Sequence, residues 1–510
     1  MPNDAKTEEG GLTVERLFSG PQGLTFDDII ILPPFSSCPE GLTVATSVAR
    51  GLEIKLPVIS SPMDTVTEWR TAVEMALQGG LGIIHFNLTP EEAAEQVRRV
   101  KRFQMGFITE PLCRPPACPL REVREVKREY GFSTILVTED GTPHSRFLGM
   151  VSRAHAAFEE DEVRPIRDVM TPAGKLRVCS RSEVPSLKEA RDILHHDPLL
   201  QKLPILNPDG SVFALVTRDD VVKSGRYPHA LTDANEQLRV GASVSTQKDD
   251  WSRVEALIAA GVDLLVIDTA QGGTSYAVSR LKEIKRQRPD LPVIAGNVVT
   301  VDQARPLVEA GADGLRVGMG SGSICTTQGV LGIGRPQLSA VHEVASWSPV
   351  PVISDGGTRG TADIVKALAC GASAVMVGRY IAGCDETPGD VMLSGSQRLK
   401  RYRGMGSAGA IRDGGSRRYG HEADRQRKPA VVQGVEGWVP AAGPLEGILT
   451  ETAAAIAKAL EYLGCASVAE LHQQVRLGRI RFQLRSDAAR QEGAVHDISV
   501  SQMAGPPRKE

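Results

Sequence analysis

The 510-residue chain has few aromatic residues, few cysteines, no long apolar run and almost no excess charge. Aromatic residues make up 4% of it, and its eight cysteines include no CxxC pair, which argues against a disulfide scaffold or a structural zinc site. No stretch approaches the roughly 20 apolar residues that a membrane-spanning helix needs. The formal net charge of −3 argues against a dedicated nucleic-acid-binding protein.

The two ends of the chain also lack targeting signals. The first residues, MPNDAKTEEGG, are polar and acidic, unlike a signal peptide. The last three, Arg508-Lys509-Glu510, do not form a peroxisomal tripeptide. We therefore expect a cytoplasmic protein with no membrane partner.

Glycine and proline are abundant, at 51 and 32 residues, which is typical of a protein with many turns between strands and helices. Three passages repeat one pattern of helix end, glycine and apolar strand: residues 259–268, 309–318 and 369–378. Further apolar strands are predicted at 56–61, 81–86, 238–245, 291–297 and 350–355. This makes two strands before residue 112 and six after residue 230. The pattern predicts an α/β fold, a (β/α)8 TIM barrel, because a doubly wound sheet does not account for eight similar units.

Residues 113–230 interrupt this rhythm with a duplication of their own. TILVTEDG (134–141) matches LPILNPDG (203–210), and FLGMVSRAH (147–155) matches VFALVTRDD (212–220). Two such units of about 60 residues are expected to pack their apolar faces together. Thr217 and Asp220 have the spacing of a helix cap or of a ribose-binding pair, and the cap is the commoner use. The first unit has Ser152 and His155 instead.

The predicted organisation has three parts. Residues 1–111 form the first part of the barrel with an N-terminal arm, of which 1–25 are expected to be loose and polar. Residues 112–230 form the inserted pair. Residues 231–510 complete the barrel and add a basic, Arg- and Gly-rich mobile flap (about 394–432) and a C-terminal helical segment.

The stretch RVGMGSGSICTTQ (316–328) is the strongest candidate for chemistry. Glycines after a buried strand allow a tight turn whose N–H groups point outward, and such N–H groups favour a thiolate at Cys325. A passive thiol in an ordinary turn is the alternative. Other polar residues also follow predicted strands, so the barrel would gather them on one rim. They include Asp268, Asn297, Asp355 with its two glycines, and Arg379; the glycines suit a phosphate and Asp355 a ribose diol.

Several of these motifs resemble one known family. SSPMDTVTE (60–68), AGNVVT (295–300), GMGSGSICTTQ (318–328), SDGG (354–357), KRYRGMGS (400–407) and RRY (417–419) are similar to inosine-monophosphate dehydrogenase and guanosine-monophosphate reductase. The duplicated insert resembles their tandem CBS (Bateman) domain, which binds regulatory purine nucleotides. The resemblance implies a homotetramer or octamer that acts on IMP, XMP or GMP with NAD or NADPH.

The resemblance also assigns roles by position. Cys325 would attack C2 of the purine, and Thr327, Arg418 and Tyr419 would assist hydrolysis of the resulting thioimidate. The substrate-binding positions would be Ser61, Ser323, Asp355, Gly356, Gly357, Gly378, Arg379, Tyr402, Met405, Gly406 and Gln433. The cofactor-binding positions would be Asp268, Asn297, Arg316 and Gly318. A potassium ion would bind Gly320, Gly322 and Cys325, with Glu492 and Gly493 from a neighbouring chain.

Three interpretations of the function follow. The flap pair Arg418-Tyr419 and the insert favour an NAD-dependent dehydrogenase that converts IMP to XMP. Thr269-Ala270 after Asp268, Arg379 after Gly378, and RPQLSAV (335–341) are closer to a reductase that uses NADPH to convert GMP to IMP and ammonia. A non-catalytic nucleotide-binding regulatory protein would not need Cys325, Thr327 and the flap pair together.

Overall fold

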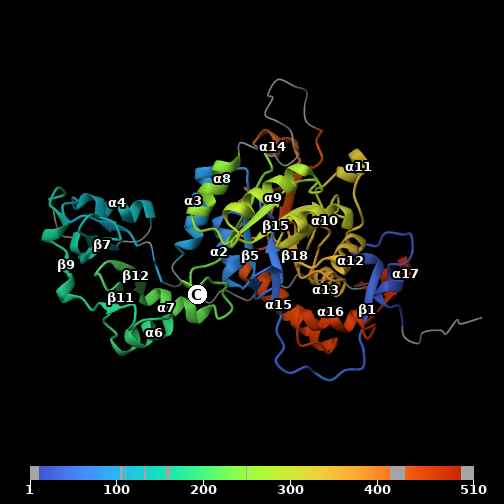
Figure 1. The fold of residues 1–510 in the computed structure, drawn as a ribbon, viewed down its shortest axis with the longest axis horizontal. Coiled ribbons are helices and arrows are strands. Elements are labelled where there is room, and N and C mark those ends of the chain that lie inside the picture. The colour runs from blue at the N-terminus through green and yellow to red at the C-terminus, as the bar shows by residue number, and fades with distance from the viewer. Residues whose placement is uncertain are drawn as a thin grey trace, which may run out of the picture.

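A closed barrel of eight parallel strands forms the centre of the molecule (Figure 1). The computed structural model describes residues 11–103, 107–109, 111–130, 134–156, 161–247, 250–413 and 431–494. The strand order is β13-β14-β15-β16-β17-β18-β4-β5, and β5 pairs with β13 to close the barrel. Their bounds are β4 (Val58–Ser60), β5 (Leu81–Ile84), β13 (Gly241–Val244), β14 (Leu264–Asp268), β15 (Val293–Val298), β16 (Gly314–Val317), β17 (Val352–Asp355) and β18 (Ala374–Val377). The predicted barrel, with two strands before the insert and six after it, is confirmed.

Helices follow the strands and cover the outside of the barrel. They are α2 (Trp69–Leu77), α3 (Pro90–Lys101), α8 (Trp251–Ala259), α9 (Ser275–Gln287), α10 (Val301–Glu309), α12 (Gln337–Trp347) and α13 (Thr361–Ala369). The short helix α11 (Thr327–Leu331) lies instead in the connection between β16 and α12. A capping box begins α3: the side chains of Thr89 and Glu92 each accept a hydrogen bond from the other residue's backbone N–H. Two further helices, α15 (Leu445–Tyr462) and α16 (Val468–Arg476), pack against α13.

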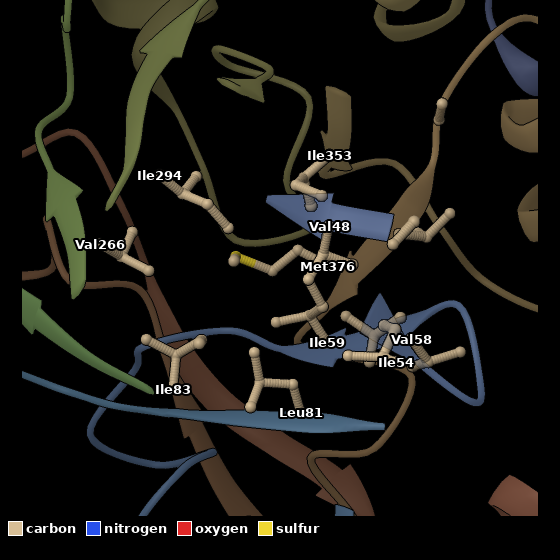
Figure 2. Close-up of a cluster of buried hydrophobic side chains, with 14 of the residues drawn as sticks. Val48, Ile54, Val58, Ile59, Leu81, Ile83, Val266, Ile294, Ile353 and Met376 are labelled. Carbon is tan, nitrogen blue, oxygen red and sulfur yellow. The ribbon is translucent and has the colours of Figure 1, made fainter. Parts of the chain in front are cut away.

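Branched apolar side chains fill the barrel interior. Figure 2 shows Ile59, Ile83, Val266, Ile294 and Met376, which come from five different strands and converge on one another. These side chains are fully buried or nearly so. A packed interior fixes the strand ends relative to one another, so polar groups at those ends have defined positions.

The insert forms two small sheets that lie to one side of the barrel in Figure 1. One has the order β6-β7-β8-β9 and the other β10-β11-β12. Their bounds are β6 (Cys113–Arg114), β7 (Thr134–Thr138), β8 (Phe147–Ser152), β9 (Thr171–Pro172), β10 (Cys179–Ser180), β11 (Lys202–Leu206) and β12 (Val212–Thr217), with helices α4 (Arg121–Tyr130), α5 (Arg153–Ala156), α6 (Leu187–His196) and α7 (Arg218–Arg226). Leu136 and Phe147 of one half share a buried cluster with Val212 and Leu215 of the other. The predicted packing between halves is confirmed.

The candidate pair in the second half of the insert caps a helix. The Asp220 carboxylate accepts from the Thr217 N–H at 2.9 Å and from its hydroxyl at 2.7 Å, and the Asp220 N–H donates to Thr217 Oγ1 at the start of α7. In the first half, His155 Nδ1 lies 3.0 Å from Ser152 Oγ and its Nε2 lies 2.9 Å from Thr171 Oγ1. The imidazole takes the place of the carboxylate and reaches a neighbouring strand.

The prediction of a loose N-terminal arm is wrong for residues 11–25. The short helix α1 (Val14–Leu17) buries Val14 and Leu17, which lie three residues apart and therefore on one helical face. A 3-10 turn, η1 (Phe26–Asp28), then leads into β1 (Ile29–Leu32). The strand β1 pairs antiparallel with β22 (Arg481–Leu484), which precedes α17 (Asp487–Glu492), so the two ends of the described chain are joined.

The expected flap is ordered over its first part. Strands β19 (Val391–Ser394), β20 (Gln397–Arg403) and β21 (Glu436–Pro440) form an antiparallel sheet, and α14 (Ala408–Arg412) follows β20. Tyr402 and Met405 are buried, so this part of the predicted flap packs against the rest of the protein. The predicted flap residues Arg418 and Tyr419 lie outside the described residues.

All eight cysteines are free thiols, which fits the absence of a disulfide framework. Within the described ranges, no helix is long and apolar enough to cross a membrane.

Candidate active site

A cavity of about 240 Å³ opens at the carboxyl ends of the barrel strands. Most of its wall comes from the turns that follow β4, β16, β17 and β18, together with Tyr402, residues 404–406 and residues 433–434. The predicted residues in this wall are Ser61, Asn297, Arg316, Gly318, Gly320, Gly322, Ser323, Cys325, Thr327, Asp355, Gly356, Gly357, Gly378, Arg379, Tyr402, Met405, Gly406 and Gln433. Residues nearly 400 positions apart in sequence are thus brought together around one cavity.

Cys325 lies in the turn between β16 and α11 and is partly exposed to this cavity. Its Sγ is 3.1 Å from Thr327 Oγ1, and the Thr327 hydroxyl donates to Gln433 Oε1 at 3.1 Å. Because the hydroxyl proton is directed to Gln433, the lone pairs of Thr327 Oγ1 are available to accept from the thiol. The three groups form a route by which a proton can leave the cysteine.

Backbone bonds fix this turn against residues 433–435. The Thr326 N–H donates to the Gln433 carbonyl at 2.9 Å, and the Val435 N–H donates to the Ile324 carbonyl at 3.0 Å. The Gln433 N–H donates to the Gly406 carbonyl at 3.1 Å. The cysteine turn, residues 433–435 and the end of β20 are therefore one hydrogen-bonded unit.

The turn after β16 needs glycine for steric reasons. Gly318 has φ +150°, and a Cβ there would lie 1.9 Å from the Asp355 carbonyl oxygen. Gly356, at φ +107°, would place a Cβ 2.4 Å from Ser321 Oγ. The two turns approach closely enough that side chains are excluded from both.

A buried charge network lies beneath the cavity. Arg316, 1% exposed, donates to Asp268 Oδ1 at 2.6 Å and to Asp355 Oδ2 at 2.9 Å. Asn297 Nδ2 donates to Asp355 Oδ2 and to the Gly318 carbonyl, both at 2.8 Å. Of the four predicted cofactor positions, Asn297, Arg316 and Gly318 line the cavity. Asp268 is fully buried and does not line it. Both bonds to Asp355 use Oδ2, which leaves Oδ1 for a ligand.

Ser61, Gly378 and Tyr402 form one side of the cavity. A Cβ at Gly378 would lie 3.1 Å from the Tyr402 hydroxyl and 3.6 Å from Ser61 Oγ, so only glycine keeps this corner open. The Tyr402 hydroxyl interacts with Ser323, and burial raises the pKa of Tyr402 to about 12. The phenol stays protonated and can donate a hydrogen bond at physiological pH.

Sequence reasoning missed an ion pair that holds this side in place. Arg403 donates to Asp64 Oδ2 at 2.6 Å, and the two side chains are 10% and 7% exposed. Asn87 Nδ2 also donates to Asp64 Oδ2, at 2.8 Å. Asp64 lies in the motif SSPMDTVTE (60–68) and Arg403 in KRYRGMGS (400–407), but nothing in either motif indicates that the two residues pair. Arg359, in the loop after β17, lines the cavity and was likewise missed.

The predicted potassium positions fall into two groups. The Gly320 carbonyl accepts from Gln328 Nε2 at 2.9 Å, and the Gly322 carbonyl accepts from the Cys325 N–H at 3.0 Å. Glu492 and Gly493 are exposed at the end of α17 and do not line the cavity. One chain alone does not assemble the full set.

Comparisons with known proteins agree with this geometry. A model of the IMP dehydrogenase / GMP reductase domain matches residues 23–496. Inosine-5'-monophosphate dehydrogenase of Trypanosoma brucei brucei is 42% identical, with 97% of this chain and 96% of the relative covered. That of Schizosaccharomyces pombe is 40% identical, with 97% and 95% covered.

Among solved structures, a cysteine-to-alanine variant of GMP reductase from Trypanosoma brucei in complex with guanosine 5'-monophosphate superposes with a TM-score of 0.83. It is 34% identical and covers 94% of this chain and 99% of its own. A second structure of the same variant gives a TM-score of 0.66 at 32% identity and covers 94% of this chain and 100% of its own. The chain belongs to the family of IMP dehydrogenases and GMP reductases.

Proposed function

We propose that this protein catalyses the NAD-dependent oxidation of IMP to XMP. The observation that carries the proposal is the Cys325–Thr327–Gln433 arrangement beside a nucleotide-sized cavity, in a chain with full-length similarity to IMP dehydrogenases. A cysteine thiol within hydrogen-bond distance of a hydroxyl that can relay its proton suits a nucleophile, whereas simple binding of a nucleotide does not need one.

In the proposed reaction Cys325 loses its proton toward Thr327, and Sγ bonds to C2 of the purine. C2 then gives up a hydride, which leaves a thioimidate between Sγ and C2. Bound NAD supplies the hydride acceptor. Water attacks C2, the C–S bond breaks, and XMP and the free thiol are released with a proton. We assign activation of this water to Arg418 and Tyr419 from the family resemblance.

The remaining predicted residues position the nucleotide. Gly356, Gly357 and Gly378 leave room for backbone N–H groups to approach a phosphate, and the protonated Tyr402 hydroxyl is a further donor. Arg379 adds a cation at the same wall. Asp355 Oδ1 is placed to accept from a ribose hydroxyl. Asn297 and Arg316, with Asp268 behind them, would form the side that receives NAD.

We further propose that potassium and a second subunit complete the turn around Cys325. Carbonyl oxygens are suitable ligands for a hard monovalent cation. The Gly320 and Gly322 carbonyls fit in type, although Gln328 must release the first of them. Glu492 and Gly493 would come from a neighbouring chain in a homotetramer. Activity should therefore rise with potassium and not with lithium at equal ionic strength.

The insert is proposed to be a tandem CBS domain that binds regulatory purine nucleotides, chiefly near Thr217 and Asp220. Nucleotide binding that is undiminished in Asp220→Ala would contradict this. Because Asp220 also caps α7, circular dichroism of the variant is the control for lost structure.

The test of the main proposal is absorbance near 340 nm with two substrate pairs at fixed potassium. IMP with NAD should give a rising signal as NADH forms. An alkylator directed at Cys325 should abolish this turnover, and IMP should protect against it.

The second candidate is an NADPH-dependent GMP reductase. It is favoured by the GMP reductase structure at a TM-score of 0.83 and by Ala270, a departure from the dehydrogenase motif that lines the cavity. GMP with NADPH would then give a falling signal and ammonia, and IMP with NAD no signal.

A further inference from the structure

The 3-10 turn η1, near the N-terminus, touches the loop after β17 at several points. Gly356, Gly357 and Arg359 of this loop line the active-site cavity. Asp27 Oδ1 accepts from Arg359 Nη2 at 2.5 Å. The Phe26 ring lies 3.2 Å from the position that a Cβ on Gly357 would occupy. Buried Lys366 of α13 donates to the Phe26 carbonyl at 2.8 Å.

The same loop is held from the other side by Asp363 of α13. Its Oδ2 accepts from the Arg359 N–H at 2.9 Å and from Arg359 Nε at 3.4 Å. The Arg359 guanidinium therefore bridges one carboxylate on the barrel and one on the N-terminal turn. The Arg359 hydrogen bond holds the pKa of Asp27 below its usual range, so Asp27 is ionised at neutral pH.

The turn η1 is itself fixed to the C-terminal segment. Asp28 Oδ1 accepts from Arg490 Nη2 at 2.6 Å, and the Asp27 carbonyl accepts from Arg490 Nε at 3.2 Å. The Asp28 carbonyl accepts from the Arg485 N–H at 2.8 Å. Asp27 is thus held in position by the C-terminal segment, which is not part of the barrel.

We propose that Asp27 is a positioning residue for the substrate: through Arg359 it holds the loop 355–359 in the shape that receives the nucleotide phosphate. This rests on the proposed function, because the phosphate site is part of it. Asp27 itself does not line the cavity, so it acts through Arg359. The N-terminal turn would then set affinity for the nucleotide and leave the chemistry at Cys325 unchanged.

The experiment compares Asp27→Asn, Arg359→Gln and the double variant, with Glu15→Gln as the matched control on the exposed face of α1. The Asp27–Arg359 pair is about half exposed, at 49% and 59%. We therefore expect Asp27→Asn to raise KM for IMP roughly threefold to fivefold, with kcat and KM for NAD unchanged. The double variant should be no worse than Arg359→Gln alone, and Glu15→Gln should match the wild type.

The salt dependence of KM distinguishes loss of the ion pair from a general structural defect, which would not depend on salt in this way. The difference in KM between wild type and Asp27→Asn should shrink at about 1 M salt, because an exposed pair is screened there. An unchanged KM in Asp27→Asn would overturn the proposal. So would a fall in kcat together with a rise in both KM values.

Calorimetric binding of IMP and GMP separates failure of this inference from failure of the proposed function. A wild type that binds either nucleotide without turning it over refutes the proposed reaction. The affinity of Asp27→Asn for that nucleotide then still tests the role of the Asp27–Arg359 contact. A wild type that binds neither nucleotide refutes both. Equal affinity of wild type and Asp27→Asn refutes the inference alone.

Discussion

Replacing Arg403 by methionine should reduce both stability and substrate affinity, because the change leaves the buried Asp64 carboxylate without its cation. Arg403 and Asp64 are 10% and 7% exposed and meet at 2.6 Å. At an effective dielectric constant near 20, two unit charges at that distance attract by about 6 kcal/mol, most of which offsets desolvation. Among the described residues, Arg403→Met leaves the buried Asp64 carboxylate the Asn87 amide as its remaining side-chain partner, and breaking such a pair costs about 3–5 kcal/mol.

The opposite change should cost less. Asp64→Asn leaves Arg403 its second carboxylate, Asp413, whose Oδ2 is 2.8 Å away and whose side chain is 59% exposed. We expect a loss of about 1–3 kcal/mol. Adding Asp64→Asn to Arg403→Met should restore part of the stability, because the double variant contains no unpaired buried charge.

The assay is the apparent midpoint of thermal unfolding at one scan rate, with KM for IMP measured in parallel. Arg403→Met should lower the midpoint by roughly 5–10 °C. The substitution should also raise KM for IMP, because Tyr402 and Met405, which are close to Arg403 in the chain, line the cavity. Arg401→Met is the matched control: its pair with Glu436 is 35% and 38% exposed and is worth less than about 1 kcal/mol. A double variant no more stable than Arg403→Met would refute the reasoning.

Three further predictions concern the cavity itself. Cys325→Ala should abolish turnover while calorimetry still detects IMP binding, since the thiol is needed for chemistry and not for recognition. Gly378→Ala should raise KM for IMP roughly tenfold or more, because its Cβ would crowd the Tyr402 hydroxyl and Ser61. The pKa of Tyr402 is raised to about 12, so folding favours its neutral form. The stability that this group contributes is full below pH 10 and is lost between pH 10 and 12. The free energy of unfolding of the wild type should therefore fall over this pH range by more than that of Tyr402→Phe.

The barrel could be predicted because its repeats are local. The barrel strands lie directly before polar or glycine-rich turns, and most of the barrel helices end next to a glycine or begin at a capping side chain, so a short window contains the signal. Parallel strands then place all their carboxyl ends on one rim. This is why Asn297, Arg316, Cys325 and Asp355 could be grouped before their distances were known.

The two errors of the sequence interpretation have one physical cause. Residues 11–25 and 397–412 look polar in sequence, but they are fixed by long-range contacts that no local pattern encodes. Arg403 pairs with Asp64, and the Leu24 N–H donates to Ser339 Oγ at 2.8 Å. Asp268 shows that a position at a strand end does not by itself predict access to the cavity. It ends a strand on the correct rim, yet Arg316 holds it behind the cavity wall.

These contacts divide the molecule into a scaffold and the walls attached to it. Apolar side chains pack the barrel interior, whereas the walls contributed by β20, residues 433–435 and the N-terminal turn are attached through charged or backbone contacts at the rim. Disrupting one such attachment should loosen one wall while the barrel stays folded. We therefore expect the affinity for the nucleotide to depend on residues outside the cavity wall, such as Asp27 and Asp64, each of which holds an arginine at the rim.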